Sequence, residues 1–260
     1  MKKTINQTVL FSLFVFLSFS LHAQFQWEMG TFVGVSNYQG DFVESNTPLF
    51  KESNFAFGIL GRYNLNYEWA VRGGIVVGKI TGRDLNFSDP QLKTRGGSFS
   101  NVLKELSVSM VWEPLGKKRY FSKAGGFKKL ISPYGFAGVG LLSMNPKVMF
   151  TEEGAAARAE RIKQDENAKY FNTRITVPFG AGVRVDLSEN WSLSVEVGMR
   201  YAFTDYLDGT SIAAGAGAKD WYNFSGLTVF HRLPNTRTTF ATRVKKKKKK
   251  KAAVKKDEEG

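Results

Sequence analysis

Charged side chains lie inside segments that otherwise alternate like β-strands, and they are the residues of this chain best suited to chemistry. Between Trp191 and Phe203, apolar residues occupy every second position, and Glu196 and Arg200 lie between them. Successive residues of a strand point to opposite faces, so both charges share the face opposite the apolar one. If that face is enclosed, the charges must be paired.

Two chemistries are open to such groups. Two carboxylates can act as general acid and base, and the candidate dyads are Glu28 with Glu196 and Glu105 with Asp186. Each acid also has an arginine of matching parity nearby in sequence, as Asp186 has Arg184. We therefore interpret the acids as members of neutralised structural pairs, not as catalytic dyads.

Other catalytic and binding chemistry finds little support in the sequence. His231 is the only histidine beyond the N-terminal segment, and the chain has no cysteine. The spacing of Asp205, Asp208 and Asp220 matches no calcium-binding loop. The glycine-rich stretches 135–142 and 178–185 do not lie between a parallel strand and a helix, as a dinucleotide site requires. We expect no enzymatic activity, no metal and no cofactor.

Eight segments have the length and the period-two pattern of strands. Eight is also the smallest common strand number of a transmembrane β-barrel. In 133–143 and 221–232 both parities hold apolar residues, so their inward faces are ambiguous. The expected strands are 27–38, 55–65, 69–80, 104–113, 133–143, 174–187, 190–203 and 221–232.

The face opposite the apolar one distinguishes a barrel from a soluble sheet. A soluble sheet would expose Thr, Lys, Ser and Gln there, whereas this face holds glycine and balanced charges. An eight-stranded barrel has an interior just wide enough to be filled by side chains. We predict an all-β, eight-stranded antiparallel transmembrane β-barrel of the outer membrane. Its predicted lumenal charge network is Glu28, Arg62, Arg72, Glu105, Arg184, Asp186, Glu196 and Arg200.

The connections alternate in length, as barrel connections do when both termini are periplasmic. The links 66–68 and 188–190 are short, and 39–54, 81–103, 144–173 and 204–220 are long. The exception is the basic segment 114–132, which is long where a short turn is expected. Segment 151–171, rich in Ala, Glu, Lys and Arg, predicts a short helix in the third, extracellular loop.

The two ends of the chain differ from the barrel. Residues 1–23 read as a signal peptide, with Lys2 and Lys3 before an apolar run and cleavage after Ala23; a retained anchor is the weaker alternative. Residues 24–235 form the expected barrel, and 236–260 a disordered, lysine-rich periplasmic tail. The net charge of +14 comes largely from that tail, so we expect no nucleic-acid partner. The tail is either simply solvated or a tether to an acidic surface.

Several stretches resemble the Bacteroidota outer-membrane barrel proteins typified by PorG, a component of the type IX secretion apparatus. The most specific are "FTDYLDGTS" (203–211) and the downstream "DWY" (220–222). The other matching stretches are "NYQGDF" (37–42), "RYNLNYEWAVRGGIVVGKITG" (62–82), "SPYGFAGVGLLSMNPK" (132–147), "VPFGAGVRVDLSENWSLSVEVGMRYA" (177–202) and "NFSGLTV" (223–229).

The resemblance implies a non-enzymatic component of a protein-export machine, which anchors or positions a periplasmic ring at the outer membrane. The implied partners are the ring lipoprotein and its companion, similar to PorK and PorN, besides outer-membrane lipid. The alternatives are a general small barrel that stabilises the envelope or passes small solutes, and a lipid-modifying enzyme that depends on His231. The candidate docking residues of the turn and tail are Lys117, Lys118, Arg119, Lys123, Lys128, Lys129, Lys245 and Lys251.

Overall fold

The computed structural model describes residues 27–40, 42, 52–116, 129–167, 172–204, 206–210 and 220–233. The predicted signal peptide and tail lie outside these residues. The strands are β1 (Trp27–Gln39), β2 (Asn54–Asn64), β3 (Trp69–Arg83), β4 (Gly97–Trp112), β5 (Ile131–Ser143), β6 (Lys147–Phe150), β7 (Thr173–Asp186), β8 (Trp191–Ala202) and β9 (Trp221–Arg232). The helical elements are η2 (Asp84–Asn86), α2 (Pro90–Lys93) and α4 (Glu152–Asn167).

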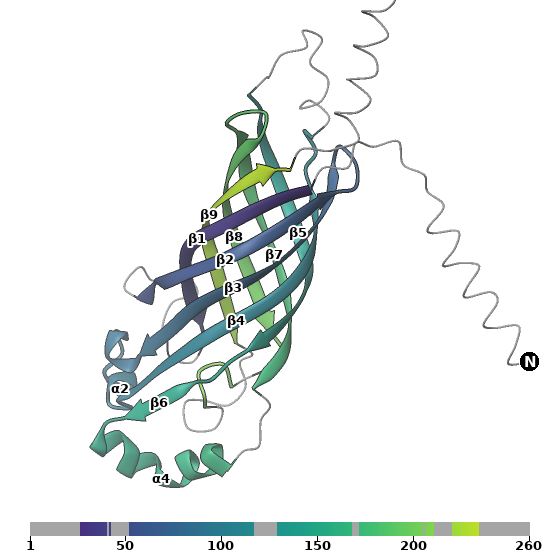
Figure 1. Cartoon of the computed structure of the whole chain (residues 1–260). Helices are drawn as coiled ribbons and strands as arrows, with labels where there is room; N and C mark the ends of the chain where they lie inside the picture. The colour runs from purple at the N-terminus through teal and green to yellow at the C-terminus, as the bar shows by residue number, and fades with distance from the viewer. Residues whose placement is uncertain are drawn as a thin grey trace, which may run out of the picture. The chain divides into compact units, whose positions relative to one another are not determined.

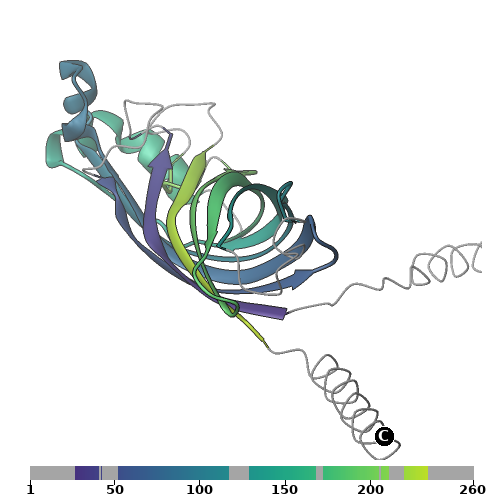
Figure 2. The same cartoon turned by 90° about the horizontal axis from the view of Figure 1, so that it is seen from above.

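Eight long strands close into a barrel, which confirms the predicted fold. Each pairs antiparallel with its neighbours along the chain, and β9 pairs with β1 to complete the ring. Figure 2 shows the strands curving around one axis. The additional short strand β6 pairs with the first residues of β4 and lies outside the ring of eight.

The two ends of the barrel differ in their connections (Figure 1). At one end, here the turn end, residues 65–68, 113–130 and 187–190 join successive strands. At the other, the loop end, the connections are 40–53, 84–96, 144–172 and 203–220, and they carry η2, α2, β6 and α4. The predicted alternation of connection lengths, with its exception near residue 114, matches this arrangement.

Two features of the loop end differ from the expected elements. β4 begins at Gly97 instead of residue 104, and its pairing with β3 continues as far as Arg83 opposite Ser98. The outward residues of this extension include Ser98 and Ser100, so the apolar alternation ends before the strand does. α4 confirms the expected helix and is kinked at Arg158, whereas α2 and η2 were not predicted because they are too short to show periodicity.

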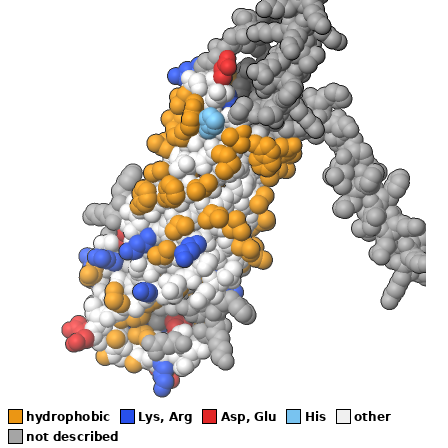
Figure 3. All heavy atoms as spheres, viewed as in Figure 1, with side chains coloured by type: hydrophobic (Ala, Val, Ile, Leu, Met, Phe, Trp, Pro, Cys, Tyr) orange, Lys and Arg blue, Asp and Glu red, His pale blue; other side chains and the backbone are white. Residues whose placement is uncertain are grey.

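The outside of the barrel carries a continuous band of exposed apolar side chains (Figure 3). Phe55 is 66% exposed and Val139 63%, values that water-facing strands would not tolerate over such an area. At the turn end the band is bordered by aromatic pairs, including Trp69 with Trp112 and Trp27 with Tyr63. Such a band with an aromatic border is the lipid-facing surface of a membrane-spanning barrel. None of the helices in the described residues is long and apolar enough to cross a membrane.

The inside of the barrel explains the two ambiguous strands. In β5 and β9 the inward side chains are themselves aromatic, with Tyr134, Phe136, Tyr222 and Phe224 buried. Glycines on neighbouring strands leave room for such rings. A Cβ added to Gly30, for example, would lie 2.5 Å from a ring carbon of Phe230. Both faces of these strands are therefore apolar, one toward lipid and one toward the lumen.

Candidate functional site: the lumen and its two ends

Charged side chains fill the lumen near the turn end. This turn-end cluster consists of Glu28, Arg62, Glu113, Arg184, Asp186 and Arg232, all buried. Its centre is the Glu28 carboxylate, which lies 2.7 Å from Nη2 of Arg184 and 3.3 Å from Nε of Arg232. Arg62 and Arg232 occupy the positions directly opposite Glu28 on the two neighbouring strands. The strand register thus places guanidinium groups on both sides of one acid.

Two further acids complete the turn-end cluster. Oε2 of Glu113 lies 2.8 Å from Nη2 of Arg62 and 3.7 Å from Nη1 of Arg184. Asp186 accepts a hydrogen bond from Arg232. Three carboxylates thus face three guanidinium groups. Pairing of this kind is required because an unpaired charge in such a site costs several kcal/mol.

A second group of charges, the central cluster, lies nearer the middle of the barrel and contains Arg72, Glu105, Glu196 and Arg200. Nη1 of Arg72 lies 2.6 Å from Oε2 of Glu196, which also accepts a hydrogen bond of 2.7 Å from the Tyr134 hydroxyl. Glu105 faces Nε of Arg200 at 3.4 Å. Tyr222 donates to the same Glu105 oxygen at 2.7 Å.

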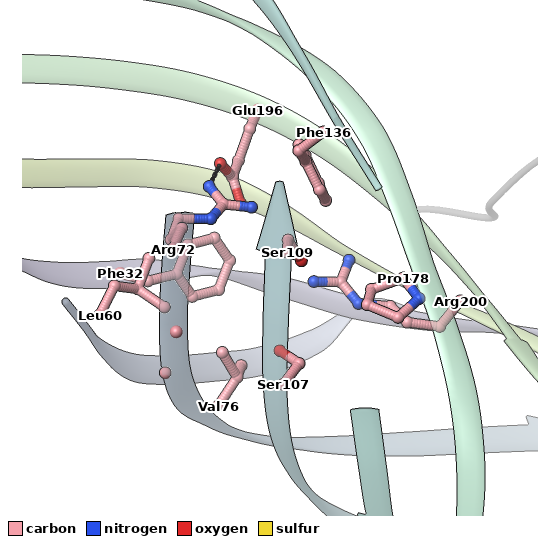
Figure 4. A pocket seen from close by; sticks show the side chains of 12 residues that line it. Phe32, Leu60, Arg72, Val76, Ser107, Ser109, Phe136, Pro178, Glu196 and Arg200 are labelled. Atoms are coloured by element: carbon pink, nitrogen blue, oxygen red, sulfur yellow. Dashed lines mark hydrogen bonds and ion pairs between the residues drawn. The ribbon is translucent and has the colours of Figure 1, made fainter. Parts of the chain in front are cut away.

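Aromatic rings and a small cavity complete the central cluster (Figure 4). The Arg72 guanidinium lies 4.3 Å from the centre of the Phe136 ring, and that of Arg200 lies 4.7 Å from the centre of the Phe224 ring. The cavity that Arg72, Glu196 and Arg200 help to line has a volume of about 10 Å³. That is about the space of one water molecule.

All eight predicted lumenal residues are buried in these two clusters, none more than 7% exposed. Their partners, however, come from other strands. Glu196 pairs with Arg72 and not with its sequence neighbour Arg200, and Arg184 reaches Glu28 across the lumen. The ion-pair partner of Glu196 is thus not the arginine nearest to it in the sequence of its own strand. Charges two or four residues apart on one strand point in the same direction. Inward charges on opposite strands point toward each other, so the ion-pair partners come from other strands.

The sequence argument missed Glu113 and Arg232, which the structure adds to the turn-end cluster. Glu113 lies eight residues after Glu105 and so has the same parity, which would have been enough to predict that it points into the lumen. Arg232 ends the strand in which both parities are apolar, so no alternation marked its direction. With both residues included, five carboxylates meet five guanidinium groups in the lumen.

At the loop end, mainly apolar and aromatic side chains fill the barrel. This loop-end plug includes Phe99, which packs against Tyr38 and Phe42 with ring centres 4.7 and 5.4 Å apart. Leu207, from the connection between β8 and β9, is fully buried in it. The plug contains Tyr38, Phe42, Phe99, Leu103, Leu142, Met144 and Leu207.

Polar contacts fasten the connection 203–220 onto this plug. The Tyr38 hydroxyl lies 2.8 Å from Oδ2 of Asp208 and 2.7 Å from Oδ1 of Asp220. Asp220 also accepts the Leu207 amide, while Asn101 donates to the Leu207 carbonyl oxygen at 2.7 Å. The two aspartates considered as cation ligands therefore hold the loop in place. Asp205 lies outside the described residues.

The connection 84–96 is fastened in a similar way. Arg95 binds both carboxylate oxygens of Asp84, at 2.8 and 2.5 Å, and stacks over the Phe42 ring at 4.6 Å. Nearby, Glu52 accepts a hydrogen bond of 2.6 Å from Asn86. Burial raises the pKa of Glu52, and the Asn86 hydrogen bond partly opposes that shift.

In the described part of the chain, His231 and the glycine-rich stretches take part in ring packing and strand pairing. The His231 ring packs against Trp191, 4.5 Å between centres, at the aromatic border of the turn end. The glycine-rich stretches 135–142 and 178–185 lie within β5 and β7, which pair directly. Among the described residues, no group of three or more His, Asp or Glu side chains could hold a metal ion.

The candidate docking residues are nearly all outside the described part of the chain. Lys129 is exposed just before β5, at the turn end. The other members of this set lie outside the described residues: Lys117, Lys118, Arg119, Lys123, Lys128, Lys245 and Lys251.

Known structures share this architecture at low sequence identity. Neisserial surface protein A is 10% identical, with 80% of this chain and 97% of that chain covered and a TM-score of 0.45. The attachment invasion locus protein Ail of Yersinia pestis is 13% identical over 80% of this chain and 99% of that chain, with a TM-score of 0.40. The outer membrane enzyme PagL is 11% identical over 80% and 99%, with a TM-score of 0.33.

No curated protein matches the sequence. The placement of the barrel in a membrane therefore rests on its closed ring of strands and its apolar outer band. A family model described as "Domain of unknown function (DUF6089)" matches residues 7–240, and the chain belongs to that family.

Proposed function

We propose that this protein is a non-conducting, non-enzymatic barrel that acts as an anchor in the outer membrane, with its exposed ends available to partners. The observation that carries the proposal is the filled lumen. The turn-end cluster, the central cluster and the loop-end plug follow one another along the barrel axis. The cavity between the charges has a volume of only about 10 Å³.

A filled lumen argues against a solute pore. Five buried ion-paired carboxylates and five buried arginines contact one another and the surrounding rings, and a solute would have to break these pairs to pass. Leaving one partner of a buried pair without its counter-charge costs about 3–5 kcal/mol. Envelope anchoring therefore fits the geometry better than porin-like transport.

Lipid chemistry has equally little support. A barrel hydrolase needs a nucleophile and a base within hydrogen-bond reach of each other. His231 instead stacks on Trp191. The lumenal acids are engaged by arginine, tyrosine and asparagine. PagL is an outer membrane enzyme, so the fold by itself does not decide this point.

A finer proposal names the partner. The resemblance of residues 203–211 and 220–222 to PorG-type barrels supports a role in the type IX secretion apparatus. In that role the barrel would position a periplasmic ring, a lipoprotein and its companion, through the basic segment 114–132 and the tail. Part of these two stretches also has a structural role, since Leu207, Asp208 and Asp220 fasten the loop to the loop-end plug.

Measuring conductance in planar bilayers tests the proposal of a non-conducting anchor. The purified mature chain, folded in planar bilayers, should give no stepwise current, because the lumen is filled. A heat-dependent shift in gel migration shows that the sample is folded. Stable single-channel currents from a folded sample would reject the anchor and favour the small-solute porin.

Gene deletion tests the finer proposal. Loss of the gene should abolish the release of secreted cargo, and crosslinking in intact envelopes should recover ring proteins with the wild type. A variant with Lys117, Lys118, Arg119, Lys123 and Lys128 changed to Gln should lose those crosslinks, whereas K93Q/K163Q at the loop end should retain them. Normal secretion in the deletion strain would leave the anchor standing and remove the secretion role.

A further inference from the structure

At the loop-end margin of the apolar band, the outward side chains are aromatic on one side of the barrel and basic on the other. Trp69 begins β3 and Lys79 follows ten residues later, and Trp191 and Tyr201 have the same spacing on β8. At about 3.3 Å per residue and a tilt of about 40°, this spacing spans about 25 Å, the height of a membrane band. Lys79 and Tyr201 therefore both lie at the interface opposite the tryptophan border.

On the β7–β9 side this second interface is aromatic. The Trp221 ring lies 4.8 Å from that of Tyr201 and 6.0 Å from that of Phe179. Phe203 packs against Tyr201 at 4.9 Å. Such rings suit the boundary between acyl chains and headgroups without preference for a charged lipid.

On the β3, β4 and β6 side, Lys79 and Lys104 occupy the corresponding level, and Lys147 lies four residues nearer the loop end than Lys104. The strand register places Lys104 opposite Val77, which makes Lys79 its diagonal neighbour at about 7–8 Å. Lys147 lies opposite Ser100 on the other side of β4. All three are exposed, and none forms an ion pair within the described residues. Figure 3 shows Lys and Arg side chains gathered below the apolar band on this face.

An apolar groove lies next to Lys104, on its turn-end side. Its walls are Leu106, Val108, Val139, Leu141 and Ile175, and its volume is about 380 Å³. Leu106 follows Lys104 by two residues on β4, so it points outward from the same face.

The strand pairing helps to explain the groove. The pairing of β5 with β7 is interrupted between Ala137–Phe179 and Gly140–Thr176. Pro178 lies in that gap and has no amide hydrogen to donate. The outer surface is thus hollowed where the sheet is least continuous.

We propose that this groove and the three lysines form a binding site for one phosphate-bearing acyl lipid of the leaflet that meets the loop end. The acyl chain lies in the groove. The lysine stems run along the apolar wall and their ammonium groups reach the headgroup phosphate. Charge complementarity selects this occupant, since an anion between the neighbouring Lys79 and Lys104 compensates their like charges and Lys147 adds a third cation on the loop-end side.

Native mass spectrometry of the full mature chain in zwitterionic detergent tests the site, with dioleoyl phosphatidic acid and dioleoyl phosphatidylcholine as probes. The wild type should retain one phosphatidic acid in preference to phosphatidylcholine. K79Q/K104Q/K147Q should weaken phosphatidic acid binding by about tenfold or more. The control K93Q/K129Q/K163Q removes the same charge from exposed lysines elsewhere and should bind as the wild type does.

Two further arms separate the parts of the site. Val139→Trp should fill the groove and weaken lipid binding while the lysines remain. Millimolar inorganic phosphate should fail to displace the lipid, because it makes no use of the groove. Equal binding of the two lipids, or equal binding by the triple variant and its control, would overturn the proposal; displacement by inorganic phosphate would reduce it to a free-anion site. Heat-dependent gel migration confirms that each variant is folded.

Discussion

The turn end and the loop end of the lumen are closed by opposite chemistries. At the turn end, six buried ionic side chains from five strands or strand ends meet each other, and Glu28 contacts both Arg184 and Arg232. At the loop end, Tyr38, Phe99 and Leu207 pack as an apolar core that two connections cover. The ionic end depends on charge balance and exact register. The apolar end depends on volume and on loops held in place.

The largest expected effect is at the ionic end. Arg184→Leu should lower the free energy of unfolding by about 4 kcal/mol, because Glu28 and Glu113 lose a shared buried cation. Urea titration of the folded barrel in lipid vesicles measures this. Arg161→Leu, an exposed change on α4, is the control. Removal of the acid as well, in R184L/E28Q, should recover part of the loss; no recovery would count against charge balance as the cause.

The apolar end should respond to lost volume. Leu103→Ala should cost about 3 kcal/mol, since Leu103 is fully buried in the loop-end plug. Val102→Ala, at its exposed, outward-facing neighbour, should cost much less in the same urea titration. Similar losses for both positions would mean that the plug is not a packed core.

The central cluster should give an intermediate result. Arg200→Leu should cost about 2 kcal/mol, because Glu105 loses its cation but keeps the hydrogen bond from Tyr222. Adding Tyr222→Phe should then make the loss larger than the sum of the single changes. An unchanged melting temperature for Arg200→Leu would show that the pair contributes nothing.

The fastening of the loop is a smaller contribution. Asp208→Asn should cost about 1 kcal/mol, since the charge that Tyr38 and the Thr210 amide contact is lost. The effect should be local, with faster hydrogen exchange in 206–210 and unchanged exchange in β1–β4. Glu160→Gln on the exposed face of α4 provides the control. Uniformly faster hydrogen exchange throughout the barrel would show that Asp208 does not act locally on residues 206–210.

The smallest effect should be a pH dependence at the loop end. Burial raises the folded pKa of Glu52 above its ordinary 4.5, although the hydrogen bond from Asn86 partly opposes the shift, so the folded state favours the protonated carboxyl. That stabilisation is complete below pH 4.5 and decreases as the pH rises through the higher folded pKa. Hydrogen exchange of residues 84–87, corrected for intrinsic rates, should show this trend, and Glu52→Gln should abolish it. A trend that persists in Glu52→Gln would assign it to another group.

The sequence predicted the barrel well because lipid and lumen impose opposite requirements on alternate residues. Trp191 to Phe203 shows this alternation clearly. The inward face could not be predicted where apolar side chains suit both the lipid and the lumen. Phe224 is an example, because it packs on an arginine inside the barrel. The prediction also missed the start of β4, whose outward face leaves the apolar band.

The site was predictable in membership but not in pairing. Parity alone placed Glu28, Arg72 and Arg184 in one lumen. Which acid meets which arginine depends on the radial position of strands distant in sequence, and no pattern along a single strand contains that information. The lysines near the lipid-facing groove could not be recognised either, because only the register of three strands brings Lys79, Lys104 and Lys147 to one side of the barrel.

Arg232 couples the closure of the barrel to the charge balance of its interior. It lies at the end of the last strand, yet it contacts Glu28 on the first strand and Asp186 on β7. While the chain inserts, these acids lack that cation until β9 arrives beside β1. Closure of the seam and neutralisation of the interior are therefore one event. A ring closed early, without β9, would retain uncompensated negative charge, which disfavours it relative to the finished barrel.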